Sequence, residues 1–240
     1  MKFDLVRSKL EGIPYIEPER AEVLYKFIIN NQLKSCLELG FAHGVSSCYI
    51  AAALDELGQG HLTTVDLVPA TKWQDPSIEQ LLADTGLGKW VTVVRENTTY
   101  NWFLMKMIEK QTFGDNCQPI YDFCYIDGPK NWTIDSSAFF SVDKLLREGG
   151  WVLFDDYGWI YGDREYMYGI NLDDMGDDER KIPHIKQVFH LLVMQHPNYA
   201  EFKIEDDTWA WAHKVKSDSI TIGQKGSLKA NLLDYFRKEN

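Results

Sequence analysis

The sequence has few cysteines, no long apolar run and no surplus of positive charge. Its 4 cysteines form no C-x-x-C pair, so a structural zinc site is not expected, and free thiols suit a reducing compartment. The apolar runs stop well short of the about 18 residues of a membrane-spanning helix. The first residues also lack the charged-then-apolar pattern of a leader. We therefore expect a soluble, cytoplasmic protein that does not bind membranes.

The charge balance is acidic. The chain has 36 Asp and Glu residues against 25 Lys and Arg residues, which gives a net charge of -11. Such a protein is not electrostatically suited to nucleic acid or to anionic surfaces. Its 240 residues, 45% of them hydrophobic, can bury the core of one large domain. We expect its partners to be small molecules or other proteins, and not nucleic acid.

Apolar runs of strand length alternate with helical patterns over most of the chain. Strands are predicted over 35–39, 62–66, 90–94, 121–127 and 151–155. Helices are predicted over 18–30, 46–57, 76–85, 102–110 and 133–147, the last ended by Gly149 and Gly150, whereas 1–14 and 69–73 have no clear period. This alternation is typical of an α/β fold whose doubly wound, mostly parallel sheet carries helices on both faces.

The pattern changes after the fifth predicted strand. Residues 157–181 are rich in Tyr, Gly and Asp and have little period, which favours a lid. A helix over 182–195 and a hairpin of strands over 199–204 and 208–213 follow, so the sheet would reach seven strands and end antiparallel. We expect one domain over 1–240, with an N-terminal helical region (1–34), a core (35–214) and a tail (215–240) with a helix at 228–236.

A glycine turn follows the first predicted strand. The apolar run stops at Gly40, and after Gly44 a helical pattern begins at Ser46. In a parallel sheet this is the corner where a nucleoside or phosphate binds, and Asp66, at the end of the second strand, could accept both ribose hydroxyls. The spacing is Gly40-x-x-x-Gly44 and not G-x-G-x-x-G, so a dinucleotide site is poorly supported. An ordinary strand-to-helix turn that binds nothing is the alternative.

Carboxylates also end the fourth and fifth predicted strands. If these strands are neighbours, Asp127, Asp155 and Asp156 converge, and they would repel one another unless protonated or neutralised. Mg²⁺ could neutralise them through hard oxygen ligands. Lys130 could serve instead as an internal counter-ion. A further alternative is that Asp155 and Asp156 only cap the next turn.

Together these stretches resemble the class I S-adenosylmethionine-dependent methyltransferases. The resemblance covers about 35–213 and is closest to small-molecule O-methyltransferases, including the catechol-type and antibiotic-sugar branches. The stretches that carry it are Leu37-Glu38-Leu39-Gly40 with Gly44 and Ser46, the strand-ending Asp66, Ile126-Asp127-Gly128, and Gly149-Gly150 leading into Phe154-Asp155-Asp156-Tyr157. It implies the Rossmann-like methyltransferase fold.

The resemblance also implies roles for individual residues. The cofactor S-adenosylmethionine would contact Glu38, Gly40, Ala42, Ser46, Asp66, Thr98, Asp127 and Gly128. In the metal-dependent branch Mg²⁺ would bind Asp127, Asp155 and Asp156. Lys130 matches the lysine that takes the proton of the acceptor hydroxyl, so Lys130 and Asp127 are the expected catalytic residues. Two departures are Asp156, where the catechol-type pattern has Asn, and Pro129-Lys130, where the sugar branch often has His.

The expected activity is transfer of a methyl group to a hydroxyl of a small molecule, assisted by Mg²⁺ if the metal-dependent pattern holds. Two alternatives stay open. A nicotinamide-dependent oxidoreductase would share the glycine corner and Asp66 but should carry G-x-G-x-x-G, and a non-catalytic protein could use the same fold.

His43 is a second candidate for the base that takes the proton of the acceptor hydroxyl. The aromatic residues of the predicted lid, Trp159, Tyr161, Tyr166 and Tyr168, could stack on a substrate ring, or they could only pack the lid or a dimer. The lid and the C-terminal helix are the surfaces expected in a homodimer.

Overall fold

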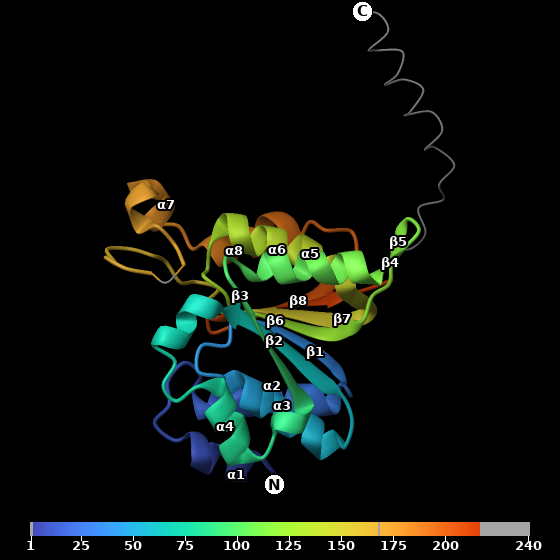
Figure 1. The fold of residues 1–240 in the computed structure, drawn as a ribbon. Coiled ribbons are helices and arrows are strands. Elements are labelled where there is room, and N and C mark those ends of the chain that lie inside the picture. The colour runs from blue at the N-terminus through green and yellow to red at the C-terminus, as the bar shows by residue number, and fades with distance from the viewer. Residues whose placement is uncertain (1, 168, 217–240) are drawn as a thin grey trace, which may run out of the picture.

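The centre of the molecule is a seven-stranded sheet of order β3-β2-β1-β6-β7-β9-β8 (Figure 1). The structure, a computed structural model, describes residues 2–167 and 169–216. Strands β3, β2, β1, β6 and β7 are parallel, and β9 is antiparallel to both β7 and β8. The strands are β1 (Ser35–Leu39), β2 (His61–Leu67), β3 (Val91–Glu96), β6 (Tyr121–Ile126), β7 (Leu146–Phe154), β8 (Tyr199–Glu205) and β9 (Trp209–Lys214). The predicted fold class is confirmed.

Helices cover both faces of the sheet. In Figure 1, α1 (Lys2–Leu10), α2 (Pro18–Asn30), α3 (Val45–Leu57) and α4 (Ile78–Thr85) lie below it, and α5 (Tyr100–Gln111), α6 (Trp132–Leu145) and α8 (His184–Val188) lie above. Strands β1 and β6 are almost wholly buried between these layers, as central strands covered on both faces are. The sequence therefore forms a sheet with no solvent-facing side at its centre.

Three details differ from the expectation. Residues 2–10 form helix α1, because Phe3, Val6 and Leu10 share one buried stripe. Gly149 and Gly150 lie inside β7 and do not end the preceding helix, which stops at Leu145. The predicted loop at 69–73 is largely a 3₁₀ turn, η1 (Val68–Lys72).

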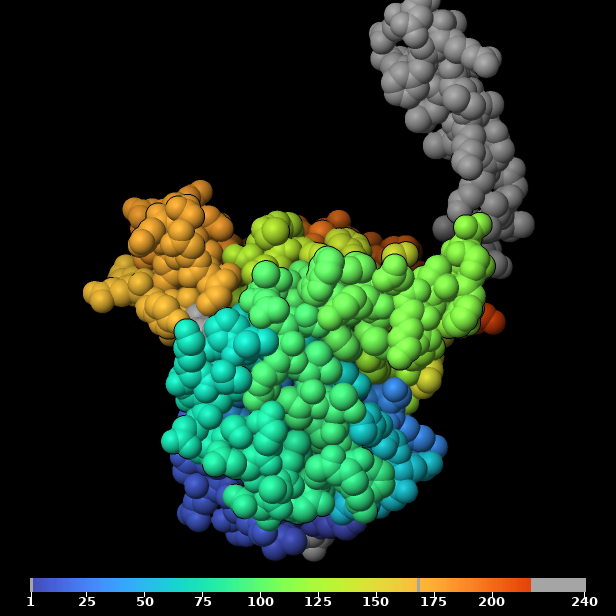
Figure 2. Space-filling view, viewed as in Figure 1, coloured from blue at the N-terminus to red at the C-terminus, as the bar shows by residue number. Residues whose placement is uncertain are grey.

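Shorter elements complete the described chain. A 3₁₀ turn, η2 (Gly88–Trp90), precedes β3, and a small hairpin, β4 (Thr112–Phe113) with β5 (Asn116–Cys117), follows α5. The 157–181 segment contains η3 (Leu172–Asp174) and α7 (Asp177–Arg180) and projects from the body as the orange lobe in Figure 2. A π-helical turn, η4 (Phe189–Val193), continues α8. The helix predicted at 228–236 lies outside the described residues.

The topology brings the functional candidates to one edge of the sheet. The parallel strands all end at this edge, and β9, which runs the opposite way, begins there. Residues that follow β1, β2, β3, β6 and β7 can therefore meet residues at the start of β9. Among the described helices, none is both long and apolar enough to cross a membrane.

Candidate active site

A cavity of about 480 Å³ opens at this edge of the sheet. One half, here called the β1–β3 side, includes Gly40, Ala42, Asp66, Leu67 and Thr98. The opposite half, the β9 side, includes Glu17, Arg20, Thr208 and Trp209, and Tyr15 and Met167 also line the cavity. Between the two lie Asp127, Gly128, Lys130, Asp155 and Asp156. Six of the predicted cofactor residues and all predicted catalytic and metal-binding residues thus line one cavity.

The turn after β1 depends on Gly40. Its φ of +90° falls in the left-handed region, and a Cβ there would collide with the Asp127 carbonyl oxygen. The Gly40 amide donates to the Val65 carbonyl at 2.8 Å, and the Asp127 amide donates to the Leu39 carbonyl at 2.8 Å. Glycine is therefore required where the chain segments after β1 and β6 cross at the cavity floor.

Asp66 joins the end of β2 to this turn. Its Oδ2 accepts from the amides of Phe41 at 3.2 Å and Ala42 at 2.9 Å. Its Oδ1 accepts from the Leu67 amide at 2.7 Å. Burial raises the pKa of the Asp66 carboxyl, and these amide donors oppose that shift. The carboxylate is held rigidly on the cavity wall, as a group that recognises a ligand must be.

Glu38 and Ser46 lie behind the turn and do not line the cavity. Glu38 is fully buried and accepts from the hydroxyls of Ser46 at 2.5 Å, Thr64 at 2.6 Å, and Ser47. These bonds join β1, β2 and the start of α3. Burial raises the pKa of Glu38, while the hydroxyl donors oppose the shift. In this structure both residues support the turn from the inside.

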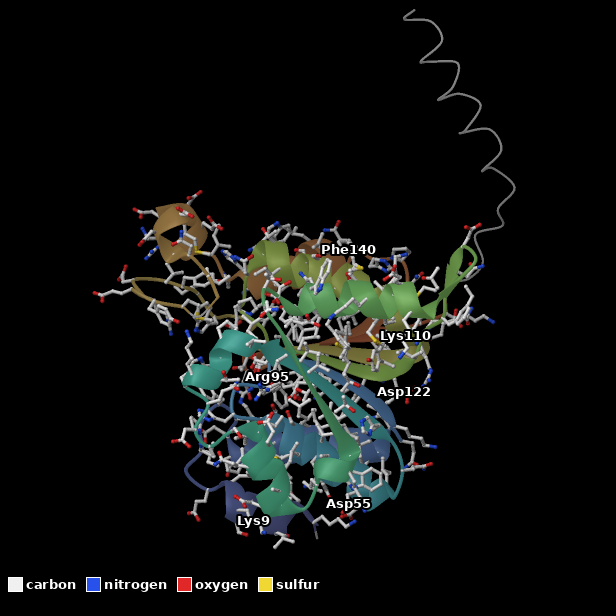
Figure 3. All side chains as sticks on the ribbon, viewed as in Figure 1. Lys9, Asp55, Arg95, Lys110, Asp122 and Phe140 are labelled. Carbon is white, nitrogen blue, oxygen red and sulfur yellow. The ribbon has the colours of Figure 1, made fainter. Side chains whose placement is uncertain are left out.

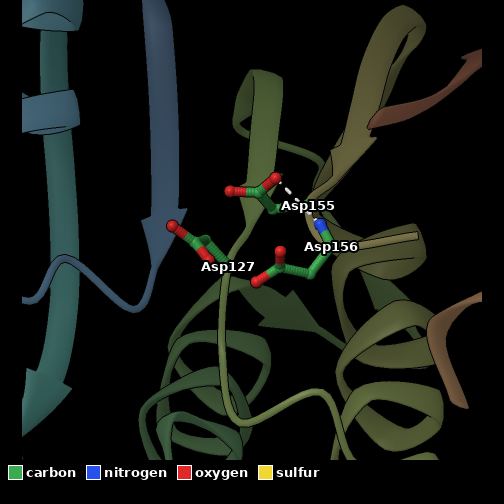
Figure 4. A group of neighbouring side chains, drawn as sticks. All are labelled: Asp127, Asp155 and Asp156. Carbon is green, nitrogen blue, oxygen red and sulfur yellow. Dashed lines mark hydrogen bonds between the residues drawn. The ribbon is translucent and has the colours of Figure 1, made fainter. Parts of the chain in front are cut away.

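Three carboxylates converge between the two sides of the cavity (Figure 4). Asp127 follows β6, and Asp155 and Asp156 follow β7; one carboxylate oxygen from each lies within 4.8 Å of the others. Asp155 accepts from the Asp156 amide at 2.8 Å and from the Tyr125 hydroxyl at 2.6 Å. The convergence inferred from neighbouring strands is therefore present.

Lys130 lies among these carboxylates. Its Nζ is 2.8 Å from Asp127 Oδ1 and 3.2 Å from Asp156 Oδ2, and only 14% of its side chain is exposed. Burial alone would lower the pKa of Lys130, but Asp127, Asp156 and Asp155 outweigh it and raise that pKa. Burial raises the pKa of Asp127 well above its ordinary value; Lys130 opposes this shift, and the other two carboxylates add to it. Lys130 is thus an internal counter-ion and carries its proton firmly.

Other predicted residues lie elsewhere. His43 is 2.9 Å from the Pro76 carbonyl through Nδ1 and packs against the cavity-lining rings of Tyr15 and Trp73, but does not itself line the cavity. In the predicted lid, the buried Tyr161 donates to the Pro129 carbonyl at 2.7 Å. Trp159 and Tyr166 do not line the cavity, and Tyr168 lies outside the described residues.

Sequence reasoning missed the β9 side of the cavity. The sequence predicts only a helix around Arg20 and only a strand at Trp209, with no role for either residue in a site. A signal existed for Trp209: the first residue of an antiparallel strand lies at the edge where its parallel neighbours end. No comparable signal marked Arg20, because the position of α2 over β9 depends on tertiary packing.

Comparisons with known proteins agree with this fold. A family model described as "Methyltransferase domain" matches residues 37–157. No curated protein matches the chain. The O-methyltransferase TomG from Streptomyces achromogenes, involved in tomaymycin synthesis and solved with SAM, is 15% identical, with 90% of each chain covered and a TM-score of 0.61.

Two further solved structures share the fold. The O-methyltransferase from Bacillus cereus, solved with SAH, is 18% identical over 90% of this chain and 89% of its own, with a TM-score of 0.59. The SAH-bound methyltransferase PaMTH1 from Podospora anserina is 13% identical over 90% of this chain and 86% of its own, with a TM-score of 0.61. These likenesses cover nearly the whole described chain.

Proposed function

The chain belongs to the methyltransferase-domain family that its residues 37–157 match, and from this premise we propose that it transfers the methyl group of S-adenosylmethionine to a hydroxyl of a small molecule. The observation that carries the proposal is the shared cavity, which holds Asp66 at one side and the Asp127–Lys130 pair next to it. Solved structures of the same fold contain SAM or SAH, which supports this choice of methyl donor.

The β1–β3 side is suited to the cofactor. Asp66 would accept hydrogen bonds from the ribose hydroxyls, and Thr98 would lie near the adenine. The backbone at Gly40, Ala42 and Gly128 would follow the rest of the cofactor, with Glu38 and Ser46 holding the turn from behind. The many carboxylates around the cavity also favour the positive charges of the sulfonium and ammonium groups.

The Asp127–Lys130 pair is suited to activate the acceptor. Methyl transfer requires the acceptor oxygen to lie about 3 Å from the methyl carbon, opposite the sulfur. The sequence suggested Lys130 as the base, but an ammonium whose pKa is raised does not accept a proton while it is paired. We propose that the Lys130 ammonium stabilises the developing oxygen anion and that Asp127, with its raised carboxyl pKa, accepts the proton.

The same cluster fits a magnesium ion by its chemistry. Asp127, Asp155 and Asp156 supply hard oxygen ligands within 4.8 Å of one another. When bound there, the ion would lower the pKa of the acceptor hydroxyl and orient it. Because Lys130 contacts two of these three carboxylates, it would have to release them to the ion.

The test is isothermal titration with S-adenosylhomocysteine, with and without Mg²⁺, on the wild type and on Asp66→Ala. We expect micromolar binding by the wild type and at least a tenfold loss in the variant. Asp122→Ala is the matched control, because Asp122 also accepts from two backbone amides, those of Lys34 at 3.1 Å and Ser35 at 2.9 Å. Figure 3 shows Asp122 at the opposite end of the sheet from Arg95, which lies near the end of β3.

The outcomes separate the alternatives. No binding by the folded wild type would overturn the proposal, and nicotinamide cofactors would then be titrated to test the oxidoreductase alternative. Binding without transfer of a labelled methyl group to any hydroxyl in an acceptor panel would favour a non-catalytic protein. Equal loss in both variants would show that the assay reports stability and not cofactor recognition.

A further inference from the structure

Arg20 is fixed on the β9 side of the cavity. It projects from the first turn of α2, and its guanidinium carbon lies 5.6 Å from the centroid of the Trp209 ring. One of its nitrogens donates to the Thr208 hydroxyl at 3.1 Å. This cation–π contact and the hydrogen bond to Thr208 hold the guanidinium in place. The side chain is 30% exposed and lines the cavity, so part of the guanidinium is accessible to a ligand.

Arg20 has no strong counter-ion. The nearest carboxylate oxygen, on Asp206, is 4.0 Å away and its side chain is 88% exposed, which makes the pair weak. Glu17 lines the same side of the cavity but forms no ion pair with Arg20 in the described structure. Of the described residues that line the cavity, only Arg20 and Lys130 are cationic, and Lys130 is already paired with two carboxylates. Arg20 is therefore the cation available to a ligand.

The Arg20 guanidinium and the carboxylate cluster share one wall. The Trp209 ring beneath Arg20 packs edge-on against Tyr125 with 6.3 Å between centroids, and the Tyr125 hydroxyl donates to Asp155. The Thr208 carbonyl also accepts from the amide of Tyr157, the residue after Asp156, at 2.8 Å. A molecule that contacts the cluster can therefore extend along Trp209 to Arg20.

We propose that the methyl acceptor carries a carboxylate, which Arg20 binds while the acceptor hydroxyl lies at the Asp127–Lys130 pair. This proposal rests on the proposed function and adds the substrate class. A guanidinium presents parallel N–H groups that match the two oxygens of a carboxylate. A carboxylate fits better than a phosphate, because one free arginine balances a single charge and the neighbouring carboxylates would repel a second.

The test compares acids with their neutral carboxamides on the protein saturated with S-adenosylhomocysteine. Protocatechuate and gallate are titrated beside the matching amides, which keep the hydroxyls and the ring but lose the charge. For the wild type we expect at least tenfold tighter binding of the better acid than of its amide. Arg20→Met keeps the aliphatic stem over Trp209 and should abolish that preference, and Arg20→Lys should keep only part of it.

The affinity for S-adenosylhomocysteine is measured first on each variant, so failure of the two proposals can be told apart. An unchanged cofactor affinity with a lost acid preference supports the acceptor assignment. A tenfold loss of cofactor affinity in Arg20→Met would overturn it, because Arg20 would then bind the carboxylate of the cofactor. No preference for either acid over its amide in the wild type would also overturn it.

Discussion

The Lys130 ammonium group occupies a carboxylate cluster that could otherwise bind a metal ion. It contacts Asp127 and Asp156, two of the three side chains that would hold a metal. A divalent ion must compete with it, and the strength of that competition determines whether the protein depends on metal. At the scale of single residues this competition can be measured without any acceptor.

Replacement of Lys130 by methionine should strengthen metal binding. We expect Lys130→Met to bind Mn²⁺, used as a probe for Mg²⁺, at least tenfold more tightly, because the carboxylates lose their internal counter-ion. Electron paramagnetic resonance of free Mn²⁺ gives the affinity. Lys106→Met is the matched control, since it breaks an ion pair with Glu96 of 2.5 Å on α5 and β3. Equal Mn²⁺ affinities in the two variants would contradict the competition.

Asp135 should make stability depend on pH. It is fully buried and accepts from the Tyr100 hydroxyl and the Asn131 amide, and burial raises its pKa to about 6 despite those donors. Because the folded pKa exceeds the unfolded value of about 3.9, its contribution to stability is complete below pH of about 4 and is lost as the pH rises through about 6. Asp135→Asn removes this titration.

The measurement is the free energy of unfolding in urea for the wild type and for Asp135→Asn. The stability of the wild type relative to the variant should fall as the pH rises from about 4 to about 7, by at most about 3 kcal/mol. Comparing the two proteins at each pH cancels the titration of the other carboxyl groups. A difference that stays constant over this range would show that Asp135 keeps an ordinary pKa.

At the scale of elements, the junction between β1 and α3 depends on one close approach. Gly40→Ala should destabilise the protein by more than about 3 kcal/mol, because a Cβ there meets the Asp127 carbonyl and the φ is positive. Gly58→Ala is the matched control: Gly58 ends α3 with a φ of +67° but has open space around its Cβ position, so a loss of about 1 kcal/mol is expected.

Urea unfolding of the ligand-free proteins separates the two glycine effects. The control reports the conformational strain alone, and the excess loss in Gly40→Ala reports the steric conflict between the β1 and β6 ends. Equal losses of unfolding free energy in the two variants would contradict this expectation. They would mean that the backbone after β6 shifts at little energetic cost to make room for the Cβ.

The sequence predicted the elements that have strong periodicity. The bounds of β1 and α2 agree with the prediction, since Ser35–Leu39 is a short apolar run and Pro18–Asn30 carries apolar residues at helical spacing. Helix α1 was missed because its stripe is short and its other positions are polar. The start of β7 was missed because its two glycines, Gly149 and Gly150, are typical of a helix end. In the structure Gly150 lies within the strand, where a Cβ would crowd the Asp122 carbonyl of the neighbouring strand.

The candidate site was predictable to the same extent as the topology. Residues at the ends of parallel strands, such as Asp66 and Asp127, could be brought together from strand order alone. Arg20 could not, because nothing local in α2 reveals which strand it covers. The burial of Glu38 behind the turn also depends on three hydroxyls from other elements, which no motif specifies.

At the scale of the whole molecule, cofactor binding should raise thermal stability. S-adenosylhomocysteine at about 100 times its Kd should stabilise the folded state by about 2.7 kcal/mol. For a chain of this size that corresponds to a rise in Tm of roughly 5–10 °C. Differential scanning fluorimetry measures the shift, and Asp66→Ala at the same ligand concentration should show little of it. An equal rise in the variant would place the ligand elsewhere.

The single-domain organisation over 1–240, the cytoplasmic location and a homodimer are expected from the sequence. Size-exclusion chromatography with light scattering would establish the oligomeric state directly. A strictly monomeric protein would exclude the lid and the tail as surfaces of self-association.

The cavity is divided unevenly along the chain. The stretch 37–157, which the methyltransferase family shares, supplies the β1–β3 side and the carboxylate cluster. The β9 side, with Glu17, Arg20, Thr208 and Trp209, comes from outside that stretch. Substitutions on the β9 side would therefore leave the residues of the shared stretch unchanged. Related chains could therefore differ in acceptor specificity while they keep the same methyl-transfer chemistry. Exchange of these few cavity residues between related proteins is a direct route to new selectivity.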